Sequence, residues 1–152
     1  MKKVLFVCLG NICRSPMAEA IFRDLVKKEG LEDHIQTDSA GTSGWHNGKN
    51  AHHGTLDKLK EYEIDSSNLI SRELLTEDFD QFDYIIGMDT SNITNIYSII
   101  QQPRSQKVIR LLELTDNPID VPDPYYTGDF QETYELVTAG CRALLEKIKQ
   151  EL

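Results

Sequence analysis

Short apolar runs alternate along the chain with longer stretches in which apolar residues recur every three or four positions. The short runs predict strands and lie at residues 4–8, 35–40, 84–88 and 108–111. The longer stretches predict helices. Their apolar positions are Ala18, Ile21, Phe22 and Leu25, then Leu56, Leu59 and Tyr62, then Ile93, Ile96 and Ile100, and finally Leu136, Cys141, Leu144, Leu145 and Ile148. Because two of the short runs are apolar throughout, we expect strands buried on both faces, as in a parallel sheet.

The alternation of strand and helix predicts an α/β fold. We expect a three-layer sandwich with a central four-stranded parallel sheet flanked by helices on both faces. With 152 residues and no linker, repeat or low-complexity tract, residues 1–152 are expected to form a single domain. Ligands of such folds bind at the carboxyl ends of the strands, so the loop after the first strand is the first place to look for a site.

Charge and cysteine content narrow the function classes. The formal net charge of −9 argues against nucleic acid as a partner and against a polybasic membrane-surface protein. The first apolar run is too short for a secretory signal, and no run is long enough to span a membrane, so we expect no membrane insertion and a cytoplasmic location. Three cysteines are too few, and odd in number, for a disulfide scaffold, so free thiols are expected.

The loop at residues 8–15 joins the first predicted strand to the first predicted helix. Such a connection directs backbone N–H groups and the positive end of a helix toward one point, which suits a tetrahedral oxyanion. The same field favours the thiolate form of a cysteine such as Cys8, and the thiolate is the nucleophile. Gly10 permits a tight curl and Asn11 tolerates a left-handed conformation. Arg14 adds a planar fork that can hold two phosphate oxygens.

The spacing of Cys8 and Arg14 is by itself weak support for a phosphate-binding loop. The plain alternative is a buried cysteine at a strand end and an arginine on the surface. The loop lacks both the G-x-x-x-x-G-K-[ST] and the G-x-G-x-x-G patterns of nucleotide sites. The cysteine sulfur is the candidate for close contact with phosphorus, which favours covalent chemistry at phosphate over nucleotide binding.

Residues 7–20, Val-Cys-Leu-Gly-Asn-Ile-Cys-Arg-Ser-Pro-Met-Ala-Glu-Ala, resemble the signature of the low-molecular-weight protein tyrosine phosphatases. The similarity continues in order along nearly the whole chain. Its further blocks are residues 38–42, Trp45, residues 82–85, Met88 with Asp89, and residues 123–126. The resemblance implies a cysteine-dependent phosphoric monoester hydrolase that acts on phosphotyrosine through a phosphocysteine intermediate and needs no cofactor. Its substrates would be phosphotyrosine-containing proteins or small aryl phosphates.

Chemistry and resemblance together suggest roles for the loop residues. Cys8 is the expected nucleophile, and Arg14 with the loop N–H groups is expected to hold the equatorial oxygens of phosphate. The residues that contribute these N–H groups are Leu9, Gly10, Asn11, Ile12 and Cys13. Ser15 either donates its hydroxyl to the thiolate that leaves the phosphocysteine or caps the N-terminus of the helix.

The reaction also needs an acid, because a phenolate leaves poorly unless it is protonated. Asp123 lies in Val-Pro-Asp-Pro-Tyr-Tyr, where prolines stiffen the chain, and the pattern alone is typical of a turn aspartate. The resemblance instead implies that Asp123 is the proton donor. It also implies that Trp45 and Tyr125 form the walls of a slot for a phenyl ring, although large aromatic residues are usually packing elements. Tyr126 is either part of this slot or a site of regulatory phosphorylation.

Three further expectations concern residues around the loop. Cys13 is close enough in sequence for a disulfide with Cys8; by resemblance it protects the nucleophile from over-oxidation, and the alternative is a small buried filler. Cys141 is expected in the core. By resemblance, Ser39 and Asn68 support the loop through Asn11, with Asn68 at a position where many family members carry histidine.

The segment at residues 49–55 departs from the family pattern and is expected to border the slot, where it would affect substrate preference. His46, His52 and His53 lack partners at metal-ligand spacing, so we expect surface residues and no metal.

An arsenate reductase of the same fold would need two further cysteines, and only Cys141 remains downstream. A phosphocysteine carrier would not need the acid. A phosphate-binding module without turnover would need neither the acid nor the nucleophile.

Overall fold

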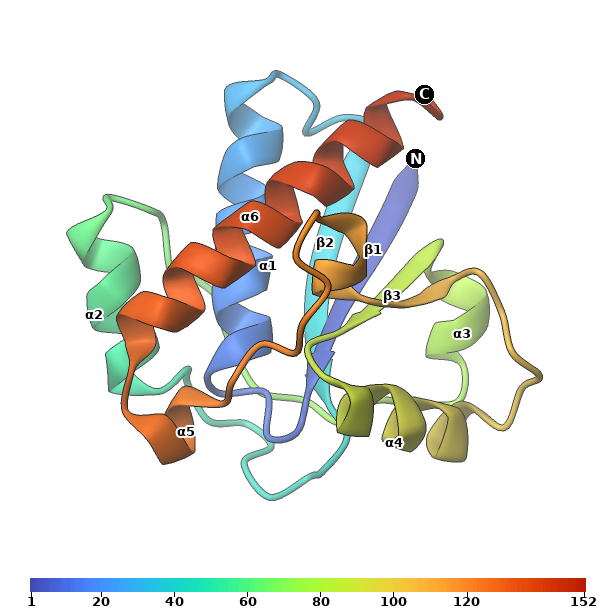
Figure 1. Cartoon of the computed structure of the whole chain (residues 1–152), viewed down its shortest axis with the longest axis horizontal. Coiled ribbons are helices and arrows are strands. Elements are labelled where there is room, and N and C mark those ends of the chain that lie inside the picture. The colour runs from blue at the N-terminus through green and yellow to red at the C-terminus, as the bar shows by residue number, and fades with distance from the viewer.

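The computed structural model describes all 152 residues and contains one parallel sheet. Its strands are β1 (Lys2–Cys8), β2 (Ile35–Gly41), β3 (Tyr84–Gly87) and β4 (Val108–Arg110), in the order β2-β1-β3-β4. The helices are α1 (Arg14–Lys28), α2 (His53–Glu61), α3 (Asp78–Gln81), α4 (Thr90–Ile100), η1 (Leu111–Leu114), α5 (Pro124–Thr127) and α6 (Phe130–Lys149). The sheet order explains the apolar runs, since β1 and β3 are the two central strands (Figure 1).

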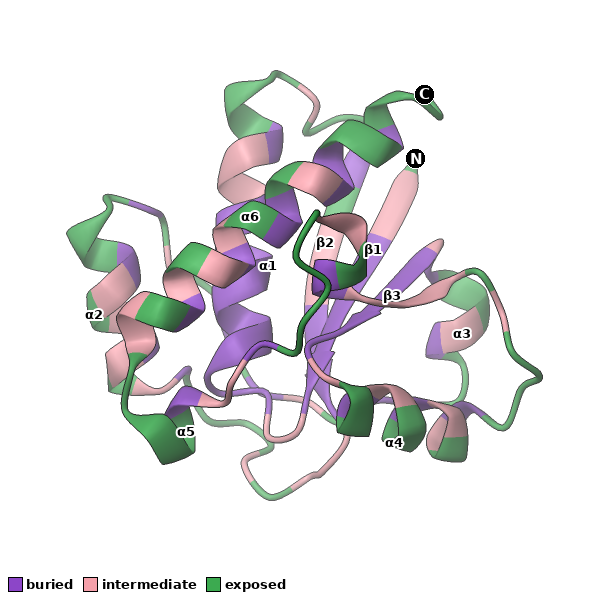
Figure 2. Ribbon diagram, in the orientation of Figure 1, coloured by how far each residue is buried: buried purple, intermediate pink, exposed green.

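Helices cover both faces of the sheet, as the sequence predicts. One core cluster joins Val4 and Phe6 of β1 to α1, α2, η1 and α6, whereas the other joins Leu5 and Val7 to α4 and its neighbours. Alternate residues of β1 therefore enter opposite cores, and these four side chains have no exposed surface. Figure 2 shows the buried residues along the sheet and on the sheet-facing sides of α1 and α6. The three-layer sandwich is confirmed.

The predicted strands agree with the structure to within two residues at each end, and the apolar positions predicted for the long helices all lie within α1, α2, α4 and α6 except Tyr62, which directly follows α2. Three short helical elements were not predicted: α3, η1 and α5. Each has only four residues, so it offers no apolar periodicity to detect. Asp89 caps α4, because its carboxylate accepts from the amide of Asn92 at 2.7 Å and completes a capping box.

The carboxyl ends of the strands meet at one edge of the sheet. There the loop after β1, the segment between β2 and α2, and α5 lie near one another, at the bottom of the view in Figure 1. The chain is so closely packed here that a Cβ on Gly41 would lie 2.8 Å from the carbonyl oxygen of Leu9. None of the helices is both long and apolar enough to cross a membrane.

Candidate active site

The loop from Cys8 to Ser15 curls so that its carbonyl groups face outward. Asn11 adopts the left-handed conformation expected for it, with φ of 56°. Carbonyl oxygens along the loop accept hydrogen bonds from surrounding segments. These bonds run from Thr42 N to Cys8 O, 2.9 Å; Ser43 N to Leu9 O, 2.9 Å; Ser71 Oγ to Gly10 O, 3.0 Å; His52 N to Ile12 O, 2.7 Å; and Thr55 Oγ1 to Cys13 O, 3.1 Å. By contrast, the amide N–H groups of residues 9–15 donate to no protein acceptor.

Cys8 is buried at the end of β1, where its sulfur lies 3.0 Å from Ser15 Oγ. Ser15 is not a helix cap. Helix α1 begins at Arg14, its N-cap residue is Cys13, and no side chain caps it. The capping alternative for Ser15 is therefore wrong, and its fully buried hydroxyl instead faces the thiol.

Arg14 is buried rather than on the surface, so that alternative is wrong as well. Its Nη1 donates to Asp89 Oδ2 at 2.6 Å and to the carbonyl oxygen of Val121 at 2.9 Å, and its Nη2 lies 3.5 Å from Asp123 Oδ2. Burial works against the charge of the guanidinium, but Cys8, Asp89 and Asp123 outweigh it and raise the pKa of Arg14 above its ordinary value. The remaining nitrogen, Nε, is buried without a partner.

Asp89 has a second contact that the sequence interpretation missed. One carboxylate oxygen caps α4 while the other holds Arg14. The position of Asp89 close behind a buried strand could have indicated this contact, because β3 lies beside β1 and their carboxyl ends are adjacent.

A pocket of about 200 Å³ opens beside the loop. It gathers residues from three distant segments of the chain: Cys8, Leu9, Gly10, Ile12, Cys13, Trp45, His46, Asp123, Tyr125 and Tyr126. The aromatic residues are not packing elements, since Trp45 and Tyr126 are 74% exposed and Tyr125 is 54% exposed. His46 was not predicted to belong here. It packs against the loop closely enough that a Cβ on Gly10 would lie 3.0 Å from its Cδ2.

Asp123 is a turn residue and a pocket residue at the same time. Its Oδ1 accepts from the amide of Tyr125 at 3.1 Å and caps α5, while Oδ2 faces Arg14. Proline at N1 of α5 suits this cap because its missing N–H needs no partner there. The two interpretations offered by the sequence are therefore compatible.

A buried hydrogen-bond network supports the loop from the side opposite the pocket. Asn11 Nδ2 donates to Ser15 Oγ at 2.7 Å and to Ser39 Oγ at 2.9 Å. Ser39 Oγ in turn donates to Glu19 Oε1 at 2.6 Å. The structure thus places Ser39 in the expected position, and it adds Glu19, which the sequence interpretation did not single out.

Asn68 does not take part in this network, so its predicted support role is wrong. Asn68 is exposed, its side chain makes no hydrogen bond, and its backbone is left-handed with φ of 61°. This conformation is one that asparagine tolerates well, which identifies Asn68 as a turn residue. The backbone N–H of Arg72 reaches Asn11 instead, at 3.0 Å from Oδ1.

The segment at residues 49–55 lies behind the loop rather than along the pocket, which corrects the expectation that it borders the slot. His52 and Thr55 bond to loop carbonyls, as described above, and none of the seven residues lines the pocket. His52 touches the site through the ring of Tyr125, with centroids 6.1 Å apart. His52 also stacks on Phe130 and is half-buried. No group of three or more histidine, cysteine, aspartate or glutamate side chains is arranged to hold a metal ion.

All three cysteines are free thiols. Cys13 is buried and lines the pocket, and this burial, together with the nearby charges of Cys8 and Asp123, raises the pKa of its thiol to about 12. Cys141 has no exposed surface and packs in the larger core, as predicted; burial raises its pKa as well. Cys13 is therefore a poor competitor for the nucleophile's role, and Cys141 is inaccessible.

Glu19 leads to a prediction about stability. Burial raises the pKa of Glu19 to about 7, so the folded protein keeps a proton that the unfolded chain releases near 4.5. The wild-type free energy of unfolding should therefore fall as pH rises through this window, by at most roughly 3 kcal/mol. Glu19→Gln removes the titration. We expect the free energy of unfolding of the variant, measured with urea, to rise relative to that of the wild type between about pH 5 and about pH 8. A constant difference would contradict the raised pKa.

Comparisons with known proteins agree with this site. Residues 3–152 match the model of the family described as low molecular weight phosphotyrosine protein phosphatase. The low molecular weight protein-tyrosine-phosphatase YfkJ of Bacillus subtilis is 49% identical over 153 residues, covering 99% of this chain and 98% of the relative. PtpA of Staphylococcus epidermidis, named likewise, is 44% identical over 152 residues, covering 99% and 96%. The crystal structure of YfkJ superposes with a TM-score of 0.95 and covers 99% of this chain and 96% of that one.

Fold, pocket and likenesses together define a protein tyrosine phosphatase, a cysteine-dependent phosphoric monoester hydrolase that acts on phosphotyrosine. Among such enzymes, the chain belongs to the low-molecular-weight phosphotyrosine protein phosphatase family. The sequence resemblance is thereby confirmed, and neither the arsenate reductase nor the phosphocysteine carrier is favoured.

Proposed function

We propose that Cys8 is the nucleophile of this phosphatase and that the loop after β1 is its phosphate-binding loop. The thiolate attacks phosphorus in line with the phenolic leaving group and forms phosphocysteine. The observation that carries the proposal is the polarity of the loop: its carbonyls are bonded outward, and a run of amide N–H groups has no protein acceptor. These donors fit the equatorial oxygens of a phosphoryl group in the transition state.

Arg14 supplies the charged part of the same cradle. Asp89 and Val121 hold its Nη1, so the guanidinium is oriented before substrate binds. The edge formed by Nε and Nη2 remains for two phosphate oxygens, since Nε has no partner and Nη2 has only the long contact with Asp123. This orientation lowers the cost of ordering the side chain during the reaction.

Asp123 and Ser15 assist the two leaving groups. Asp123 protonates the departing phenolate and, once it is ionised, accepts a proton from the water that attacks phosphocysteine. Ser15 donates its hydroxyl to the Cys8 sulfur when the thiolate departs in this second step. The 3.0 Å separation of Ser15 Oγ from the sulfur, and the place of Asp123 at the pocket, support these assignments.

Trp45 and Tyr125 form the walls of the slot above the loop, and Tyr126 lies at its outer end. Their exposure and their place around one pocket support this proposal. A phenyl ring between aromatic walls buries apolar surface that a phosphoserine side chain does not offer. Phosphotyrosine-containing proteins and small aryl phosphates are therefore the proposed substrates.

Three wider properties accompany this proposal. Residues 1–152 act as one catalytic domain, which is supported by a single sheet that collects strands from the two halves of the chain. The location is cytoplasmic, because a thiolate nucleophile needs reducing surroundings. Nucleic acid is not a partner, as the net charge of −9 indicates.

Asp123→Asn tests the acid. We expect kcat/KM for phenyl phosphate to fall by about 10²- to 10³-fold, because its phenolate needs a proton to leave. The value for p-nitrophenyl phosphate should fall far less, because that leaving group is stable without one. Asp116→Asn is the matched control, since Asp116 is an exposed aspartate seven positions before Asp123 and does not line the pocket. An equal loss on both substrates, or full activity on phenyl phosphate, would remove Asp123 from this role.

A further inference from the structure

Buried hydrogen bonds connect the Cys8 sulfur to a carboxyl group that the proposed chemistry does not use. They run from Cys8 through Ser15, Asn11 and Ser39 to Glu19. All five residues are buried, Glu19 at 7% exposure. A charged residue is rarely buried to this extent unless its partners compensate for lost hydration. The bond from Ser39 to Glu19, at 2.6 Å, is the shortest of the series.

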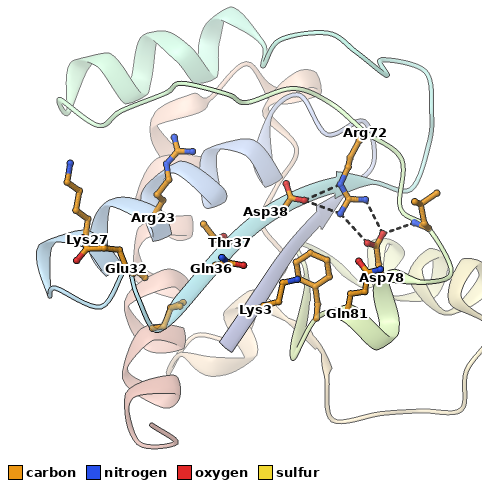
Figure 3. A pocket seen from close by; sticks show the side chains of 14 residues that line it. Lys3, Arg23, Lys27, Glu32, Gln36, Thr37, Asp38, Arg72, Asp78 and Gln81 are labelled. Carbon is orange, nitrogen blue, oxygen red and sulfur yellow. Dashed lines mark hydrogen bonds and ion pairs between the residues drawn. The ribbon is translucent and has the colours of Figure 1, made fainter. Parts of the chain in front are cut away.

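The orientation of Asn11 determines which atoms in this chain donate. The N–H of Arg72 donates to Asn11 Oδ1, so the Asn11 amide must present its NH₂ group to both serine hydroxyls. The side chain of Arg72 is held in turn between Asp38 and Asp78, as Figure 3 shows, with contacts of 3.2 and 3.0 Å. The Asn11 amide is therefore fixed against the flip that would reverse its donors and acceptors.

Both serines consequently accept from Asn11 and have one proton each to place elsewhere. Ser39 places its proton on Glu19, its other side-chain partner. Ser15 has two acceptors within reach: the Cys8 sulfur at 3.0 Å and the carbonyl oxygen of Ala40 at 3.4 Å. If Ser39 had no acceptor for its proton, its hydroxyl and the Asn11 amide would no longer be held in one orientation. The Ser15 hydroxyl would then no longer be directed toward Cys8.

We propose that Glu19 is a positioning residue for Cys8: as the terminal acceptor, it orders Ser39 and Asn11 so that the Ser15 hydroxyl donates to the Cys8 thiolate. The inference rests on the proposed nucleophilic role of Cys8 and deepens it. Glu19 touches no reacting atom. Its effect is transmitted through the three intervening side chains.

The charge of Glu19 should matter, because an ionised carboxylate accepts more strongly than a neutral carboxyl. Burial opposes ionisation and Asp38 of β2 repels it, whereas Ser39, Arg23 of α1 and Arg72 favour it, and the resulting pKa is about 7. Ionisation thus falls in the neutral range, where the chain of bonds would strengthen as pH rises. Ionisation of Glu19 thus strengthens the chain of hydrogen bonds but lowers the free energy of unfolding.

The test measures the rate at which iodoacetate alkylates Cys8 across a pH series, with inorganic phosphate as a competitor to show that the reaction occurs in the site. We expect the pH of half-maximal reactivity to rise by about one unit in Glu19→Leu, because the thiolate loses an oriented donor. Glu19→Gln should recover most of this shift, since its carbonyl still accepts. Glu29→Leu and Glu29→Gln are the controls, at the exposed end of the same helix.

Ser39→Ala is the second variant and covers the case in which Glu19→Leu does not fold. It breaks the connection while leaving the carboxyl in place, and it should raise the midpoint similarly. Unchanged midpoints in folded Glu19→Leu or Ser39→Ala would overturn the positioning role. Failure of the nucleophile proposal looks different: Cys8→Ser would keep its phosphatase activity, whatever Glu19 does.

Discussion

We expect Cys8→Ser to lower kcat for a phosphotyrosine peptide by a factor of about 10⁴ or more. A serine hydroxyl ionises far less readily than a thiol, and an alkoxide is a poor leaving group in the second step. Inorganic phosphate or vanadate should still bind, because the loop N–H groups and Arg14 are unchanged. Steady-state kinetics and calorimetric titration with phosphate measure the two properties separately.

Cys141→Ala is the control for this variant. Its thiol lies wholly in the core, so the substitution should lower the free energy of unfolding without lowering kcat. Substantial turnover by Cys8→Ser would refute the covalent mechanism. Loss of both turnover and phosphate binding would point to a collapsed loop, and circular dichroism would detect accompanying unfolding.

Arg14→Lys should lower kcat/KM by about 10²- to 10³-fold. Lysine keeps the positive charge but has one nitrogen in place of three. It cannot remain bonded to Asp89 and the carbonyl of Val121 while it also holds two phosphate oxygens. Kinetics with p-nitrophenyl phosphate give the value, and the loss should fall mainly on kcat, because the fork binds best in the transition state.

Arg23→Lys is the matched control on the same helix. Arg23 lies on the outer side of α1, where it contacts backbone carbonyls of Asp65 and Ser67 and lies 3.8 Å from a carboxylate oxygen of Glu19, and it does not line the pocket. Its substitution should leave kcat/KM within about twofold of wild type, as expected for a partly exposed side chain. If Arg14→Lys were equally active, charge alone would suffice and the planar fork would have no special role.

The sheet and its long helices were predictable because their patterns are local. An apolar run such as residues 4–8 and a stripe such as the one in α6 each record burial in the spacing of neighbouring residues. The elements α3, η1 and α5 show no such pattern, because a single turn of helix is too short for an apolar position to recur. Helix α5, for example, is stabilised by the Asp123 cap, which apolar periodicity does not reveal.

The site was predictable where chemistry restricts the choice of residue. A nucleophile and an oxyanion fork each need a particular side chain, so Cys8 and Arg14 could be proposed from sequence, whereas Asp123 could be proposed as the acid only through the resemblance. Their supports could be named only in part, because the resemblance pointed to Ser39 but neither Asp89 nor Glu19 was singled out. Asp89 reaches Arg14 across 75 positions and Ser39 reaches Glu19 across 20, and only folding brings these pairs together. Asn68 was misassigned for the same reason, since its turn directs it away from the network.

A net charge of −9 first suggests a protein that repels anions. The structure restricts that conclusion to the surface at large. The proposed phosphate site gathers aligned amide N–H groups, a helix N-terminus and one buried guanidinium, all of which act at contact distance. Screening by salt weakens distant charges far more than these, so the acidic surface and an anionic substrate are compatible.

Trapping the phosphocysteine intermediate would test covalent catalysis by Cys8. Asp123→Asn is mixed with p-nitrophenyl phosphate, quenched in acid within the first turnovers, digested and analysed by mass spectrometry. The good leaving group lets the first step proceed without an acid, whereas the missing base slows hydrolysis. We expect a burst of p-nitrophenolate and one phosphate on the peptide that contains Cys8. Phosphate on any other residue, or turnover with no covalent phosphate, would contradict covalent catalysis by Cys8.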